Sequence, residues 1–226
     1  MRRILLLLST MATLSLLMGL FGVQILWQCV QIACRPQQEP LWLPMEVEGT
    51  QMCALYLSGY AGPNFENRDA GEVVNRAALA VKNKGGFLAC GAVILEFGKE
   101  RLVFELEELP PGGQALVLEK DGRAMCSGEL TGCYGWAKEL HPEGMGLVQA
   151  TPAGGGAVAV SNLTNDVVPV VRICYRSQDP HSGVFFGGAA CRTEIRDLQP
   201  GEQRMIYPPH YSETSRILYV LTWTEE

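Results

Sequence analysis

Cysteine side chains are the first candidates for chemistry in this 226-residue sequence. Six of them follow the apolar N-terminal stretch: Cys53, Cys90, Cys126, Cys133, Cys174 and Cys191. Outside the cytoplasm, an even number of cysteines is typical of disulfides. Cys126 and Cys133 could close a short loop, and Cys174 and Cys191 lie at similar distances from a turn near Ser182. These are two candidate disulfide pairs, whereas Cys90 in its apolar stretch is also compatible with a buried free thiol.

Two other groupings contain residue types that metal sites and hydrolases use. Cys126, Cys133 and His141 could supply three zinc ligands, but their spacing matches no compact C-x2-C pattern and thiolates outside the cell tend to oxidise. Glu107 and Glu108 are paired carboxylates, yet they stand beside a turn, where solvated acids are the usual case. We therefore expect no metal site and no glycosidase-type pair.

A Ser-His-Asp combination occurs once, in Asp179, His181 and Ser182. Three neighbours in one loop rarely let the base reach the nucleophile while a third group orients it. The sequence has no G-x-S-x-G elbow, and Gly154–Gly156 lacks the following helix that a phosphate-binding loop needs. The sequence predicts neither an enzyme nor a bound cofactor.

One surface loop, Pro208–Ser215, has the composition of a contact site. Pro208 and Pro209 stiffen it, and His210 with Tyr211 offers aromatic rings with polar tips, which are enriched at binding sites. The alternative is a packed loop that only closes its module.

The N-terminus carries the strongest signal. Ile4–Cys34 contains no charged residue, which is long enough for a helix that crosses a bilayer. Arg2 and Arg3 before the span favour a cytoplasmic N-terminus. We expect a retained signal anchor, because a cleaved signal peptide, the alternative, has a shorter apolar core and a small-residue cleavage site.

This anchor predicts a single-pass protein of the cell membrane with most of its chain outside the cytoplasm. Without Arg2 and Arg3, 16 basic residues stand against 24 acidic ones, a net charge of −8. Such a surface repels phosphate backbones, so we expect no nucleic-acid partner.

A short motif occurs twice, as ELPPGGQ at 108–114 and as DLQPGEQ at 197–203. Pro and Gly suit successive positions of a turn, and the Leu before them can fill a core at a corner between two sheets. Corresponding residues are separated by 79 positions at Asn83/Asn162, 78 at Phe97/Tyr175 and 89 at Leu109/Leu198. The change in offset predicts a duplicated module with an insertion near residues 177–186. Two unrelated Pro-Gly turns are the alternative.

Short apolar runs between frequent turn residues predict an all-β fold without helices after the anchor. We expect an N-terminal transmembrane helix followed by two tandem immunoglobulin-like β-sandwich modules. The expected divisions are a cytoplasmic tip and anchor at 1–34, a Pro-rich stalk at 35–50, module 1 at 51–140 and module 2 at 141–226.

The order of strand, Asn turn, long strand ending in Phe97 or Tyr175, return strand and L-x-P-G corner resembles the FxLYD-type immunoglobulin-like modules of bacterial envelope proteins. It is also similar to membrane-anchored two-module proteins of Gram-positive gut bacteria. The resemblance implies a fold and an extracytoplasmic setting, and no catalytic residue. We expect a module that binds or positions an envelope protein or glycan. The alternative is an accessory subunit of a transport or secretion complex that acts through its membrane helix.

Overall fold

Strands make up the regular secondary structure of residues 39–66, 71–141 and 146–223, the parts of the chain that this computed structural model describes. The all-β prediction is therefore confirmed for those residues. They contain no helix that is long and apolar enough to span a membrane. The predicted anchor, Ile4–Cys34, lies outside the described residues.

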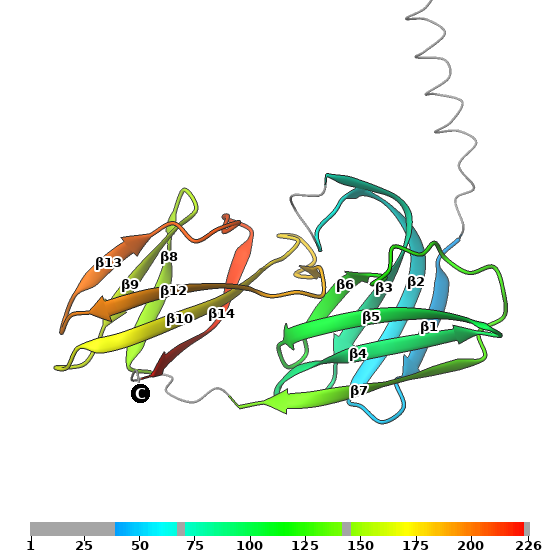
Figure 1. Cartoon of the computed structure of the whole chain (residues 1–226), viewed down its shortest axis with the longest axis horizontal. Coiled ribbons are helices and arrows are strands. Elements are labelled where there is room, and N and C mark those ends of the chain that lie inside the picture. Colours follow the sequence, from blue (N-terminus) through cyan, green and yellow to red (C-terminus); the bar gives the residue numbers. More distant parts are fainter. Residues whose placement is uncertain (1–38, 67–70, 142–145, 224–226) are drawn as a thin grey trace, which may run out of the picture. The chain divides into compact units, whose positions relative to one another are not determined.

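The first half of the chain forms two sheets (Figure 1). The sheet with strand order β1-β2-β3-β6 contains β1 (Leu41–Glu46), β2 (Met52–Pro63), β3 (Glu72–Asn83) and β6 (Gln114–Leu118). The sheet with order β5-β4-β7 contains β5 (Glu100–Leu109), β4 (Leu88–Phe97) and β7 (Gly132–Leu140). Strands β4 and β5 pair as an antiparallel hairpin with its turn at Gly98–Lys99.

The second half forms two three-stranded sheets. One has the order β13-β9-β8, with β13 (Gln203–Ile206), β9 (Ala157–Asn162) and β8 (Val148–Gly154). The other has the order β12-β10-β14, with β12 (Cys191–Leu198), β10 (Val168–Ser177) and β14 (Ser215–Trp223). Strand order in this half therefore repeats β6-β3-β2 and β5-β4-β7 of the first half, element for element.

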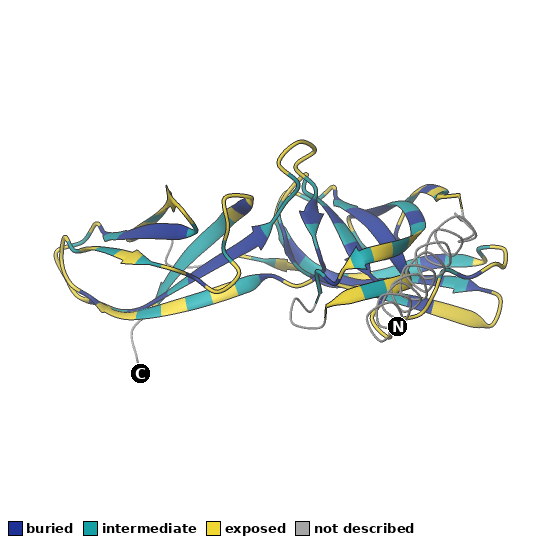
Figure 2. Cartoon of the chain, turned by 90° about the horizontal axis from the view of Figure 1, so that it is seen from above, coloured by how far each residue is buried: buried dark blue, intermediate teal, exposed yellow. Residues whose placement is uncertain are grey.

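Each half has its own cluster of buried apolar residues, and buried segments are dark blue in both halves in Figure 2. The first cluster includes Leu57, Val93 and Phe104, and the second includes Val160 and Ile173. The aromatic markers Phe97 and Tyr175 are buried, each in the cluster of its own half. The described residues from Glu39 onward nevertheless group as one compact unit.

The Pro-Gly corners repeat at atomic detail. The Asn83 side-chain amide donates to the carbonyl oxygens of Leu109 and Phe87, both at 2.9 Å. In the second half, Asn162 donates to the carbonyl oxygens of Leu198 at 3.0 Å and Asp166 at 2.8 Å. The acids before the two leucines share the left-handed backbone region, with φ 49° at Glu108 and 52° at Asp197. The predicted correspondence of Asn83 with Asn162 and of Leu109 with Leu198 is confirmed by these bonds.

Part of the predicted stalk is a strand. Leu41–Glu46 is β1, which pairs with β2, and Leu43 is buried in the first cluster. Pro44 does not prevent this, because β1 is an edge strand and its register shifts between Trp42 and Met45. Proline is tolerated at such an irregularity, where no ladder hydrogen bond is required of it.

The predicted insertion contains β11 (Phe185–Phe186). This strand does not stay in the second half but pairs in parallel with β6, with Phe185 opposite Ala115 and Phe186 opposite Leu116. Phe185 is 1% exposed and belongs to the apolar cluster of the first half. The extra residues of the second copy therefore extend the first copy's sheet.

Candidate functional site

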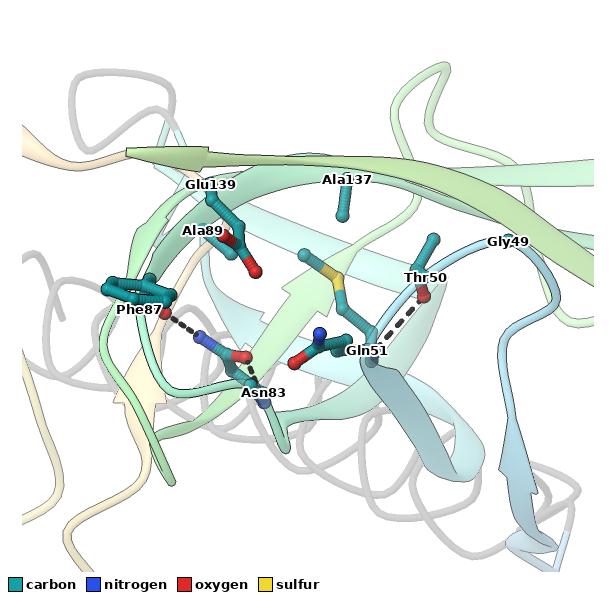
Figure 3. A pocket seen from close by; sticks show the side chains of 10 residues that line it. Gly49, Thr50, Gln51, Asn83, Phe87, Ala89, Ala137 and Glu139 are labelled. Atoms are coloured by element: carbon teal, nitrogen blue, oxygen red, sulfur yellow. Dashed lines mark hydrogen bonds between the residues drawn. The ribbon is translucent and has the colours of Figure 1, made fainter. Parts of the chain in front are cut away.

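A groove of about 510 Å³ lies at one end of the first half, between strands of its two sheets (Figure 3). Its lining comes from the β1–β2 turn, the β3–β4 turn and strands β4 and β7: Gly49, Thr50, Gln51, Met52, Asn83, Gly85, Phe87, Ala89, Ala137 and Glu139. Met52 and Ala89 are buried and supply an apolar floor. The groove is thus polar at its rim and apolar below.

The Asn83 side-chain amide, which bonds the Pro-Gly corner of the first half, also holds the backbone around the groove. Asn83 Oδ1 accepts the N–H of Gly85 at 2.8 Å while its Nδ2 holds the Phe87 carbonyl, so both ends of the β3–β4 turn are held. The N–H of Lys84 donates to the Gln51 carbonyl at 2.9 Å and joins this turn to the β1–β2 turn. The side chains above these bonds are presented on a defined backbone.

The groove carries aromatic and acidic groups. The ring of Phe87 is 49% exposed and lies edge-on to that of His141, with 4.5 Å between centroids. Glu139 Oε2 lies 3.8 Å from His141 Nε2. Figure 3 shows Glu139 and Gln51 directed toward the same space, with Phe87 to one side. This arrangement can bind a small group.

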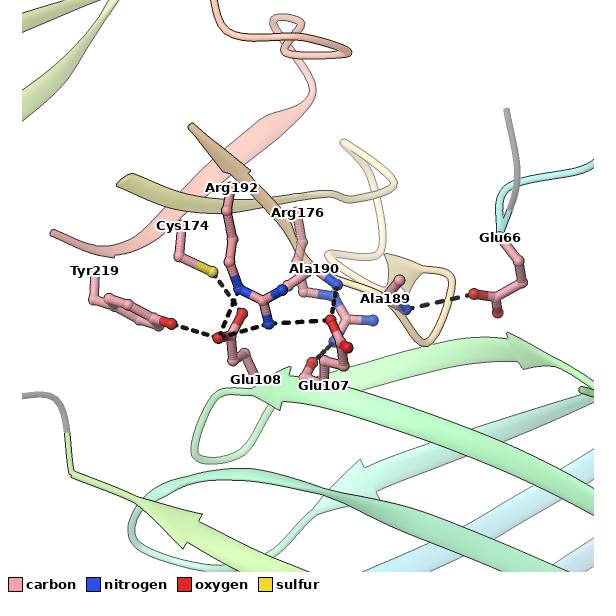
Figure 4. Close-up of polar contacts among 9 residues, drawn as sticks. All are labelled: Glu66, Glu107, Glu108, Cys174, Arg176, Ala189, Ala190, Arg192 and Tyr219. Carbon is pink, nitrogen blue, oxygen red and sulfur yellow. Dashed lines mark hydrogen bonds and ion pairs between the residues drawn. The ribbon is translucent and has the colours of Figure 1, made fainter. Parts of the chain in front are cut away.

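A second polar site joins the two halves and is centred on Glu108 (Figure 4). Glu108 Oε1 accepts hydrogen bonds from Arg192 Nη2 at 3.0 Å and from the Tyr219 hydroxyl, and its Oε2 accepts one from Cys174 Sγ at 2.7 Å. Glu107 Oε2 pairs with Arg192 Nη2 at 3.1 Å. We call this group, with Arg176, the junction cluster.

The expectation that Glu107 and Glu108 are solvated acids is wrong for Glu108, which is 5% exposed. The turn that follows does not expose this residue, because its left-handed backbone directs the carboxylate toward donors from β10, β12 and β14. Three donors, one of them cationic, compensate for the loss of water around a buried carboxylate.

Arg176, the remaining member of the junction cluster, is 1% exposed. Its guanidinium donates to the carbonyl oxygens of Glu107 and Gly187 and lies 5.5 Å from the centroid of the Phe185 ring. Its Nε is buried without a hydrogen-bond partner. Burial lowers the pKa of Arg176 to about 10, against the opposing effect of Glu66, Glu108 and Glu107.

Burial also governs the other junction groups. It raises the pKa of the Cys174 thiol, and the hydrogen bond to Glu108 adds to the effect. It raises the pKa of Tyr219 for the same two reasons. Burial opposes the charge of Arg192, but Glu108 and Glu107 together raise its pKa. Cys174 therefore stays a protonated hydrogen-bond donor, and a thiol in that state is a poor nucleophile.

A further carboxylate, Glu66, bridges the halves from the loop after β2. Its oxygens accept the N–H groups of Leu118 at 3.0 Å and Gly188 at 2.8 Å. A Cβ on Gly188 would lie 1.9 Å from the carbonyl oxygen of Glu105, so the close approach of this backbone to β5 requires glycine.

The predicted disulfide residues are free thiols in the described structure. The register places Cys174 opposite Arg192 and Cys191 opposite Tyr175, a one-residue offset that turns the two cysteines to opposite faces of the sheet. The structure therefore does not bring this pair together. Cys126 and Cys133 are both buried, and burial raises the pKa of each to about 11, with Glu100 adding to the effect at Cys126 and Cys53 at Cys133.

The two residues of the predicted contact loop, His210 and Tyr211, differ in their environment. His210 is exposed and has φ 57°. Tyr211 packs on the second apolar cluster, its ring edge-on to Tyr175 at 5.2 Å and its hydroxyl buried without a partner. The packed-loop alternative describes Tyr211 better than a surface contact.

The Ser-His-Asp combination of the sequence, Asp179, His181 and Ser182, forms a turn. Asp179 Oδ1 accepts the N–H groups of His181 and Ser182, both at 2.8 Å, which lowers the pKa of Asp179. No group of three His, Cys, Asp or Glu side chains in the described residues could hold a metal ion.

Comparison with protein-family models and with curated proteins found no match. The geometry of the groove and of the junction cluster is therefore the basis for assigning a role.

Sequence reasoning missed both sites. Arg176 and Arg192 read as ordinary strand arginines, and Phe87 as a strand residue. One signal in the sequence could have pointed to the junction cluster: Val184, Phe185 and Phe186 end an insertion whose earlier residues are mostly polar.

Proposed function

We propose that this chain is a membrane-anchored protein whose extracytoplasmic part binds or positions a partner, an envelope protein or a glycan. In this proposal Ile4–Cys34 is the anchor, and the two halves are tandem immunoglobulin-like β-sandwiches of the FxLYD type. The charge-free N-terminal stretch and the duplicated strand order support it.

The observation that carries the positioning role is the junction. Two independent halves joined only by a flexible linker would need none of three features: a buried arginine between them, a strand of one half in the sheet of the other, and a glycine where two backbones approach closely. Here β11 adds to β6, and Arg176 donates to carbonyl groups on both sides. A buried polar network is costly when broken, so it favours one arrangement of the halves over others.

The test of positioning uses the full-length chain in lipid nanodiscs, with nitroxide labels at exposed Lys99 and Gln199, one in each half. Electron-electron distance measurements should give one narrow distribution. Gly188→Val should broaden it, because the new side chain collides with β5. Gly128→Ala is the control, since its Cβ would meet nothing closer than 3.7 Å. A broad distribution in the unmodified chain contradicts the positioning role.

The test of anchoring and binding uses the same chain. Alkaline carbonate should leave it in the membrane fraction, and loss of the first 34 residues from the mature protein would contradict the anchor. Capture from an envelope extract should retain a protein or glycan reproducibly. Repeated failure to retain either counts against binding.

A further inference from the structure

The two copies differ at one position beside the corner asparagine, which lines the groove in the first copy. In each copy the residue two places after the corner asparagine donates its N–H to that side chain: Gly85 to Asn83 and Thr164 to Asn162. Thr164 also uses its hydroxyl, which bonds Asn162 Oδ1 at 2.8 Å and the Asp166 carbonyl at 2.9 Å. The second copy thus caps its asparagine with a side chain where the first copy has none.

The absence of that side chain gives room to the groove. A Cβ built on Gly85 would lie 2.7 Å from Gln51 Oε1 and 3.0 Å from Asn83 Oδ1. The end of the Gln51 side chain therefore lies in space that a side chain at position 85 would take. Because this side chain is flexible, it can move out of that space.

The groups around the opening define the chemistry of what enters. The carboxylate of Glu139 is exposed, and its Oε2 lies 3.8 Å from His141 Nε2, a long ionic contact. The nearest lysine on the β3–β4 turn, Lys84, is paired with Glu46 at 3.3 Å. An anion would be repelled by this carboxylate, whereas a cation would be attracted to it.

The apolar surfaces set the shape of the ligand. Met52, Ala89 and Ala137 line the floor, and the half-exposed ring of Phe87 stands at one side. An aromatic ring close to a carboxylate attracts a cation through both its quadrupole and the neighbouring charge. The Gln51 side-chain oxygen is a further acceptor for ammonium protons.

From this geometry we propose that the groove binds a primary ammonium group on an apolar stem, the chemistry of a lysine side chain. The stem lies over Met52 and Ala89, and the ammonium donates to Glu139 and Gln51. This inference deepens the proposed binding role and rests on it. The acidic character of the chain, a net charge of −6, favours the approach of a basic partner.

The test measures binding of Nα-acetyl-lysine-amide to the full-length chain in nanodiscs by ligand-observed NMR. The neutral probe is Nα-acetyl-norleucine-amide, whose side chain has the same four carbons as lysine but no ammonium group. The lysine probe should bind and the norleucine probe should bind at least about tenfold more weakly, as expected for loss of a charge-assisted hydrogen bond. Equal binding of both probes, or none of the lysine probe, overturns the inference.

Two variants localise the effect. Glu139→Gln should weaken lysine binding about tenfold, and Gly85→Thr, which copies Thr164, should abolish it by filling the opening. The matched control is Glu213→Gln, an exposed glutamate of the second half, which should bind as the unmodified chain does. Retained binding in Gly85→Thr would overturn the site.

The outcome can be separated from that of the proposed function. If the envelope extract yields a partner whose capture is unchanged by Glu139→Gln and Gly85→Thr, the binding role stands and the ammonium site fails. Binding of neutral oligosaccharides in place of the lysine probe would likewise overturn the proposed ligand class.

Discussion

A single buried amide fastens each Pro-Gly corner to the strand across from it. Asn83 is 1% exposed and Asn162 is 3% exposed, and each supplies its backbone partners with hydrogen bonds that no apolar side chain could make. A carbonyl oxygen left unbonded in a protein interior costs more than the bond contributes when formed. Loss of either asparagine side chain should therefore lower the free energy of unfolding by more than the hydrogen bonds alone contribute.

We expect Asn83→Ala and Asn162→Ala each to lower the free energy of unfolding by about 1–3 kcal/mol, because each leaves corner carbonyls unpaired. Urea denaturation of the full-length chain, followed by tryptophan fluorescence, would measure this. Asn165→Ala is the control, an exposed residue of the same turn as Asn162. Equal stability of all three variants would contradict the role assigned to the amides.

The carboxylate of Asp179 shapes the start of the insertion. Hydrogen bonds from the backbone N–H groups of Ser182 and His181 hold its pKa below the ordinary value of 3.8. A lowered folded-state pKa contributes stability that is present above the unfolded value and is lost as the pH falls through the folded value. The turn should loosen only in acid, below pH 3.8.

We therefore expect the amide NMR signals of His181 and Ser182 to shift together as the pH falls below 3.8. In Asp179→Asn the side-chain oxygen still accepts hydrogen bonds but carries no titrating charge. Its two amides should stay constant over the same range. If they titrate as in the unmodified chain, another acid governs the turn.

At the scale of elements, β11 shows how two residues alter the relation between two sheets. Phe185 fills the first apolar cluster and supports Arg176 above its ring, while Phe186 is only half-buried. Parallel pairing with β6 also satisfies the backbone of a segment that would otherwise be an open loop.

We expect Phe185→Ala to lower the free energy of unfolding by about 3–5 kcal/mol, because it removes a fully buried ring. Phe186→Ala, the matched control in the same strand, should cost about 1–2 kcal/mol. Differential scanning calorimetry of the two variants would compare them. A cost for Phe186→Ala equal to that for Phe185→Ala would show that the strand pairing, and not the buried ring, carries the stability.

Most strands could be predicted because their apolar runs end at Gly, Asn or Pro, as at Gly98 and Asn162. The edge strand β1 could not, since Pro36, Pro40 and Pro44 in and before it are typical of extended linkers. Only the pairing with β2 shows that Leu43 is buried. The corners were predictable because their chemistry is local. The groove and the junction cluster were not, because each combines residues more than 30 positions apart whose contacts depend on tertiary packing.

On the scale of the whole molecule, the junction cluster determines whether the halves unfold together. Glu107 and Glu108 come from one half, and Arg176, Arg192 and Tyr219 from the other. Removing Arg192 leaves the buried carboxylate of Glu108 with only neutral donors, Tyr219 and Cys174. The cost falls on the contact between halves and leaves each apolar cluster intact.

Arg192→Met should therefore lower stability by about 1–3 kcal/mol and split one urea transition into two, since each half keeps its own core. Adding Glu108→Gln should restore part of the loss, with a coupling of about 0.5–3 kcal/mol in the double-mutant cycle. Arg172 and Glu194 provide the control pair, because both lie in the second half and are 39% exposed in their side chains. Arg172→Met should cost less than about 1 kcal/mol and leave a single transition. If Arg192→Met unfolds in one step, coupling between the halves comes from β11 and the Glu66 bridge, and the ionic network contributes only locally.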